Sequence, residues 1–180
     1  MALLASSRHE VGTESYPWWV YLLVPLLALG LQSFVSLHFP SFDLIDLPLL
    51  VTIYYAITRR EPKSATVAGA LIGIAQDGLT HHALGIFGIS KAVIGYTAAS
   101  LGVRVDTDNH GTRLLLIFAF TLEQTAILWL LERRMLGQPF AVHWMHELIR
   151  ALANALAGVI LFALLDLTRR PESLGRPESF

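Results

Sequence analysis

Four ionisable side chains interrupt the apolar segments of this sequence: Asp46, Asp77, Lys91 and Glu123. Inserting a charged group at the centre of a bilayer costs at least about 2.5 kcal/mol, so each of these groups needs a partner, a change of protonation or a function. Carboxylates and amines at that depth can pair with one another, and they can also bind an ion or a solute along a polar path. The sequence therefore allows two kinds of polar site, an internal ion pair and a binding pocket.

Three of the four groups lie at a similar depth. Asp46, Asp77 and Lys91 are each 13 residues from the inner flank of their apolar segment, which is about 20 Å along a helix. We therefore expect Lys91 to pair with Asp77, with Asp46 or with both. Two alternatives stay open: the groups can be neutral, or they can lie at the level of the lipid headgroups because their helices are short.

Glu123 is the fourth group. It lies nine residues after Leu114, or about 14 Å along the helix and close to the middle of the membrane. A buried glutamate of this kind can mark the path of an ion or substrate. It can equally be protonated and hydrogen-bonded to Gln124, to Thr125 or to a backbone carbonyl.

Residues typical of enzymes and metal sites are missing or poorly spaced. The chain has no cysteine, which excludes disulfides and thiolate metal sites. His143 and His146 have no third ligand that we can place, so a zinc site is not expected. No P-loop, dinucleotide fingerprint or serine-nucleophile motif is present, and the net charge of −1 gives no reason to expect nucleic acid. We expect neither an enzyme nor a cofactor.

The elements that carry these groups are apolar. The 180 residues are 54% hydrophobic and 15% charged, whereas about a quarter of a typical soluble domain is charged. No Asp, Glu, Lys or Arg occurs from Ser15 to Phe42, and about 20 apolar residues span a bilayer. The sequence therefore predicts an all-α integral membrane protein, a bundle of about six transmembrane helices, with five spans and a re-entrant piece as the alternative. The six segments are approximately 18–37, 44–58, 64–79, 84–103, 114–131 and 151–167.

Both ends of the chain are expected in the cytoplasm. With six spans, nine of the 13 lysines and arginines lie on the inner side, as the positive-inside rule requires. Residues 1–168 would form one transmembrane domain with a polar start at 1–16, followed by a polar cytoplasmic tail at 169–180. The basic inner loops 59–63 and 169–176 could meet anionic membrane lipid or a cytoplasmic filament.

Two surfaces are candidates for contact with other proteins. The segment 135–148 mixes apolar and polar residues, as expected of a helix or loop in the outer interface, and its Phe140 and Trp144 could form a ledge for a periplasmic partner. Small residues at helical spacing permit close helix packing, either within the bundle or against the membrane anchor of a partner. These small residues are Gly69, Gly73, Gly85, Gly88 and Ala92.

Between Asp43 and Val103 the sequence resembles a known family. The basic loop TRREPKSA leads into SATVAGALIGIAQDGLTHHALGIFGISKAVIGYTAASLGVRV, where a small-residue helix ends in Asp and is followed by a Leu-Gly pair and a helix containing Gly and Tyr. This pattern resembles MreD, the rod shape-determining membrane protein family of bacteria. The corresponding residues are Arg59, Arg60, Asp77, Gly78, Leu84, Gly85, Gly95 and Tyr96.

The resemblance implies a non-enzymatic scaffold of the cell-elongation (rod) complex in the bacterial inner membrane, supporting peptidoglycan synthesis and cell shape. The implied partners are the periplasmic anchor protein MreC, the RodA glycosyltransferase with its transpeptidase partner and, indirectly, the MreB filament. The family is also similar in fold to the substrate-binding subunits of energy-coupling factor transporters. The alternative function is a small-solute binding subunit of a transporter, with Asp77, Lys91, His81, His82 and Glu123 lining its pocket.

Overall fold

The computed structural model describes residues 18–38, 44–80, 83–105, 107, 109–136 and 143–167. These residues form six α-helices and no strand, so the prediction of an all-helical protein is confirmed for this part of the chain. A short π-helical turn, Glu132–Leu136, continues the fifth helix. The helices are α1 (Trp18–His38), α2 (Leu47–Arg59), α3 (Pro62–Thr80), α4 (Ile86–Gly102), α5 (His110–Leu131) and α6 (Trp144–Asp166).

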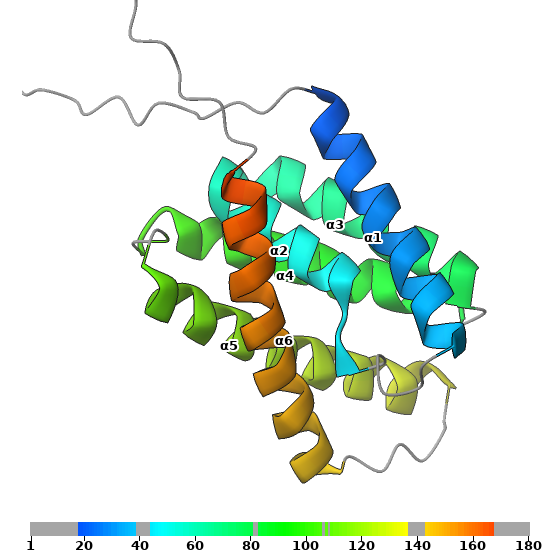
Figure 1. Cartoon of the computed structure of the whole chain (residues 1–180). Coiled ribbons are helices and arrows are strands. Elements are labelled where there is room, and N and C mark those ends of the chain that lie inside the picture. Colours follow the sequence, from blue (N-terminus) through cyan, green and yellow to red (C-terminus); the bar gives the residue numbers. More distant parts are fainter. Residues whose placement is uncertain are drawn as a thin grey trace, which may run out of the picture.

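Helix α2 lies at the centre of the bundle and contacts the other five helices (Figure 1). Every residue from Pro48 to Ile57 is buried, as expected of a helix that is hydrophobic on all sides. Its 13 residues extend about 20 Å, which is shorter than the ~30 Å hydrocarbon core of a bilayer. The second predicted segment is therefore the core helix around which the others pack.

Local signals explain where α2 begins and ends. The Asp46 side chain accepts a hydrogen bond from the backbone N–H of Leu49, as an N-cap residue does. Pro48 is compatible with the first turn, where an N–H has no helical partner. Arg60 adopts the left-handed conformation, with φ of 55°, and ends the helix. Pro62 then starts α3, so α2 and α3 form a tight helical hairpin.

The start of α1 and the end of α6 lie at the same end of the bundle (Figure 1). Arg113, near the start of α5, forms an ion pair there with Asp166 of α6. The Tyr54 hydroxyl of α2 donates to the same carboxylate at 2.8 Å. We call this part of the molecule the basic end, after Arg59, Arg60 and Arg113. Its contacts tie the end of α2 to the start of α5 and the end of α6.

Large apolar side chains face outward on all helices except α2. Leu26, Leu71, Leu115 and Ile160, from four different helices, are each more than half exposed. Soluble monomers rarely expose contiguous apolar surface on this scale. The outer surface of the bundle is therefore suited to contact with lipid.

Two segments are long and apolar enough to cross a membrane, His110–Arg134 and Trp144–Asp166. Three shorter apolar helices accompany them, at Trp19–Val35, Leu47–Arg59 and Ile86–Gly102. Helix length and hydropathy thus identify two spans, and the count of six, with five as its alternative, stays a prediction.

The predicted boundaries were wrong around the last helix. Helix α6 starts at Trp144, seven residues before the predicted segment, because Glu147 and Arg150 pair with each other and the helix can therefore include them. The expected interfacial segment 135–148 is not a separate element: its first residues belong to the turn after α5 and its last to α6. Residues 137–142 lie outside the described part.

Candidate functional site

The start of α2 is held by side chains from other helices. The first N–H groups of a helix have no partner within it. Here the N–H of Asp46 donates to Asn154 of α6 at 2.9 Å, and the N–H of Leu47 donates to Gln32 of α1 at 3.1 Å. The next residue is a proline, and the N–H of Leu49 donates to the Asp46 carboxylate at 2.9 Å. The free donors of this turn are thus satisfied inside the protein.

The Asp46 carboxylate also binds groups from α4 and α5. Its Oδ2 accepts from Lys91 Nζ at 3.0 Å and from Gln124 Nε2 at 2.7 Å. Lys91 Nζ lies 3.4 Å from Gln124 Oε1 and 4.9 Å from the ring centre of Phe87. A buried charge is tolerated when its partners are close and well aligned, and the fully buried Lys91 has a carboxylate, an amide oxygen and a ring face.

Asn154 completes this group from α6. Its Nδ2 donates to the carbonyl oxygens of Leu44 and Arg150, both at 3.0 Å. We call Asp46, Lys91, Gln124 and Asn154 the α2-start cluster. The cluster consists of one residue directly before α2 and one residue from each of α4, α5 and α6. All four side chains are buried.

Asp77 is not the partner of Lys91. Its two carboxylate oxygens accept hydrogen bonds from the backbone N–H groups of Gly85 at 2.8 Å, Phe87 at 3.2 Å and Gly88 at 3.3 Å. The last part of α3 therefore caps the first turn of α4. A carboxylate suits this place because a helix N-terminus carries unpaired N–H groups and a partial positive charge. Of the expected pairings of Lys91, with Asp77, with Asp46 or with both, the structure shows the one with Asp46.

Glu123 lies apart from the α2-start cluster. Both of its carboxylate oxygens accept from the Thr97 hydroxyl of α4, at 3.2 and 3.3 Å. The expected partners, Gln124 and Thr125, belong to other groups. Adjacent helical residues point about 100° apart, so Gln124 faces the core and Glu123 does not.

A second polar group lies at the start of α6. Glu147 accepts from the Thr125 hydroxyl at 2.9 Å and lies 3.5 Å from Arg150. The carbonyl of Arg150 in turn accepts from Asn154. Polar contacts thus continue from the α2-start cluster along α6 toward its first turn.

The small residues of α3 pack against α4 within the same chain. A Cβ atom added at Gly69 would clash with the backbone of Lys91, and one added at Gly73 would clash with the backbone of Phe87. A Cβ atom added at Gly88 would meet the side chain of Ile74 on α3. Helix α4 of the same chain occupies this surface of α3, as close packing over small residues allows. The surface is therefore not open to the membrane anchor of a partner, which was the alternative expected from the sequence.

The other two small residues have different surroundings. Ala92 belongs to the same contact, because its backbone nitrogen lies near the position of a Gly69 side chain. Gly85 has open space around it and a φ of 101°, a conformation that favours glycine. Its function is to start α4, where its N–H reaches Asp77.

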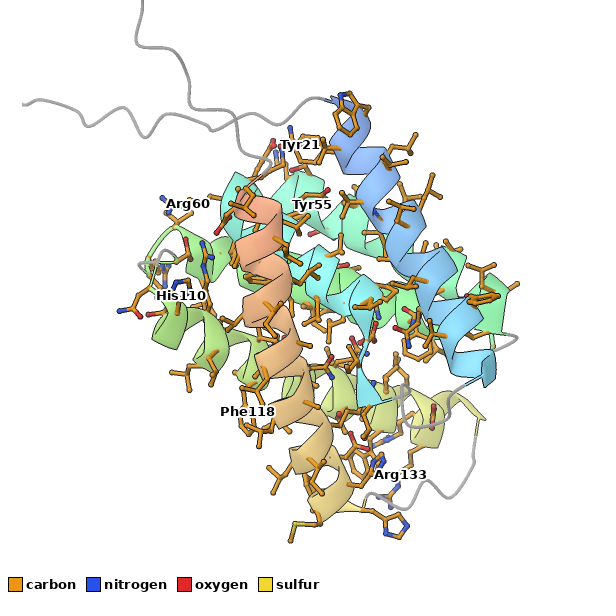
Figure 2. The ribbon with its side chains drawn as sticks, in the orientation of Figure 1. Tyr21, Tyr55, Arg60, His110, Phe118 and Arg133 are labelled. Carbon is orange, nitrogen blue, oxygen red and sulfur yellow. The ribbon has the colours of Figure 1, made fainter. Side chains whose placement is uncertain are left out.

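The predicted periplasmic surface is described only in part. Trp144 begins α6 and is 71% exposed. Phe140 lies outside the described residues, as do His81 and His82 of the alternative pocket. Figure 2 shows Arg133 at the end of the bundle where α6 begins. Its guanidinium lies 5.2 Å from the ring centre of Trp129.

Sequence analysis missed Asn154 and Gln124 as partners of Asp46. Neutral amides do not stand out against an apolar background as charges do. Helical spacing nevertheless places each on a buried face: Gln124 follows Ile117 and Phe120, and Asn154 follows Ala151. An apolar stripe with one amide in it is a signal that could have identified both.

The arrangement provides internal support rather than reactive groups. Among the described residues, no three His, Cys, Asp or Glu side chains gather as metal ligands would. The polar atoms of the α2-start cluster bind one another, and the described cavity, between α1, α2 and α3, has none of these residues in its lining. The cluster therefore joins helices.

Comparison with known proteins gives one match. A family model described as rod shape-determining protein MreD matches residues 13–167. No curated protein and no solved structure matches the chain, so the expected likeness to transporter subunits has no support from solved structures. The match covers all six helices that the structure describes. The chain belongs to the MreD family of rod shape-determining proteins.

Proposed function

We propose that this protein is a non-enzymatic scaffold of the cell-elongation machinery in the bacterial inner membrane. In this role it binds an MreC-like anchor protein on the periplasmic side and supports the RodA glycosyltransferase with its transpeptidase partner. Its link to MreB filaments is indirect. The observation that carries the proposal is the family match over residues 13–167.

The geometry of the α2-start cluster favours a scaffold over a solute binder. A solute pocket presents polar groups to a cavity. In this chain Lys91 and Gln124 are fully buried and bind Asp46. These bonds fix the position of α2 relative to α4 and α5, and a rigid bundle suits a protein whose function is to hold partners.

The first turn of α6 is the partner surface that we propose. Trp144 and Met145 are 71% and 72% exposed, and Leu148 and Ile149 extend the apolar surface by one turn. Exposed aromatic and Met side chains are enriched at protein interfaces. This turn lies at the opposite end of α6 from Asp166 and the basic end, so with cytoplasmic termini it faces the periplasm.

Affinity purification of the tagged chain in mild detergent, followed by mass spectrometry, tests the proposal. We expect an MreC-like protein, or RodA with its transpeptidase, to be recovered with the chain. The W144A/M145A double variant should recover less of the MreC-like protein. Leu164→Ala is the matched control, because Leu164 is 57% exposed near the other end of the same helix.

Other outcomes would contradict the proposal. Recovery of a transporter ATPase module, or of the chain alone with a tightly held solute, would favour the solute-binding alternative. Equal recovery of the MreC-like protein by W144A/M145A and wild type would remove the first turn of α6 as the partner surface.

A further inference from the structure

A groove with a volume of about 260 Å³ runs between α1 and α3, with α2 as its floor. Its walls are apolar and include Leu22, Leu26, Ala68 and Leu71. Leu26 and Leu71 are more than half exposed, so the groove opens to the surroundings of the bundle. A flexible apolar chain is the kind of ligand that such walls accommodate.

The length of the groove matches one leaflet of a bilayer. On α3 its lining extends from Ser64 to Ala75, which corresponds to about 16 Å of helix. Half of the ~30 Å hydrocarbon core is about 15 Å. An acyl chain that enters at one end of the groove would therefore end near the middle of the membrane.

Among the residues that the structure describes, positive charge lies at one end of the groove only. Arg59 is part of the lining, and its guanidinium lies 4.5 Å from the ring centre of Tyr21. Lys63 lies on the first turn of α3, beside Ser64 of the lining. Within the described chain, neither cation forms an ion pair with a carboxylate. Glu61, the acidic residue between them, accepts from the Ser64 hydroxyl.

We propose that the groove holds one acyl chain of an anionic phospholipid, with the headgroup phosphate at Arg59 and Lys63. The charge selects the headgroup, and the apolar walls select the chain. Figure 2 shows Tyr21 and Tyr55 at the upper end of the bundle, where this headgroup would lie. The site is separate from the first turn of α6, so it can be tested independently of the scaffold proposal.

Native mass spectrometry of the full chain in mild detergent, with equal amounts of phosphatidylglycerol and phosphatidylcholine, tests this site. We expect one phosphatidylglycerol molecule to stay bound when the micelle is removed, in preference to phosphatidylcholine. Arg59→Gln should lower that preference about fivefold, since one basic residue near an anionic surface contributes about this much. Ala68→Phe, which fills the groove, should lower the binding of both lipids.

Arg133→Gln is the control for the charge, because Arg133 is an exposed cation in the π-helical turn after α5, at the opposite end of the bundle from Tyr21 (Figure 2). It should leave lipid binding unchanged. Arg59→Gln alters only an exposed side chain, so the test stands even if Ala68→Phe does not fold. Equal binding of the two lipids by the wild type, or an unchanged preference in Arg59→Gln, would overturn the proposal. So would a dimer that Ala68→Phe dissociates, because the groove would then hold a second copy of the chain.

Discussion

The ammonium group of Lys91 lies 3.0 Å from the Asp46 carboxylate, and both side chains are shielded from solvent. The two residues are 45 positions apart in the sequence. Their contact joins α4 to the start of the central helix. Because each charge is the other's principal compensation, the loss of either one should be costly.

Lys91→Met tests this ion pair. Removing one partner of a buried pair leaves an uncompensated charge and typically costs about 3–5 kcal/mol. We expect a fall of this order in the free energy of unfolding, measured by denaturant titration in detergent micelles. The D46N/K91M double variant should lose less than the sum of the two single variants, because each single variant leaves one buried charge unpaired and the double variant leaves none. Simple addition of the two losses would show that the pair contributes nothing.

A second double-mutant cycle, between Asp77 and Lys91, provides a contrast with the first. The D77N/K91M double variant should show a much smaller coupling energy than D46N/K91M, because Asp77 binds backbone N–H groups of α4 and not the ammonium group. A coupling as large as that of Asp46 would mean that the capping geometry is wrong.

Asp77→Ala should loosen the first turn of α4. It removes the acceptor of three N–H groups, and unsatisfied buried donors cost about 1–3 kcal/mol. Hydrogen exchange measured by mass spectrometry should show faster exchange in peptides that contain Gly85 to Gly88. Asp77→Asn keeps one acceptor oxygen and should have a smaller effect. If both variants exchange at the wild-type rate, the cap does not stabilise α4.

Gly69→Ala should push α3 away from α4 and lower the stability of the protein. The added Cβ would meet the backbone of Lys91, and overpacking of this kind costs about 1–3 kcal/mol. Gly78→Ala, on the same helix, is the matched control, because nothing lies within 4 Å of its added Cβ. It should be neutral or stabilising by up to about 1 kcal/mol, as alanine is the better helix former. Equal melting temperatures for the two variants would refute the close approach.

Arg113→Lys tests the basic end. The guanidinium binds both Asp166 and the carbonyl of Thr107, and a lysine cannot reproduce this forked geometry. Because Asp166 is partly exposed, we expect a modest loss of about 1 kcal/mol, the size of one typical hydrogen bond. Arg104→Lys is the control, since no contact described for Arg104 requires a fork. A melting temperature unchanged by Arg113→Lys would contradict the importance of the two-partner contact.

Much of the architecture followed from hydropathy, and much of the polar network did not. Long apolar segments predicted the helices, since an apolar run must be helical to satisfy its backbone in lipid. The distance of each residue from the inner flank of its apolar segment correctly placed Asp46 and Lys91 at a similar depth in the membrane. It could not separate Asp46 from Asp77 as the partner, because that choice depends on the direction of each side chain. Gln124 and Asn154 lacked a charge to mark them.

The bonds around the start of α2 also determine when the protein can be completed. Asp46 binds Gln124 and also Asn154, which is 108 residues later in the chain. At a synthesis rate of ~5–20 residues per second, this interval lasts about 5 to 20 s. During that time the central helix lacks part of its hydrogen bonding, even though its own residues are already made. The hydrogen bonding at the start of the central helix is therefore completed only when α6, one of the last parts of the chain to be made, packs against it.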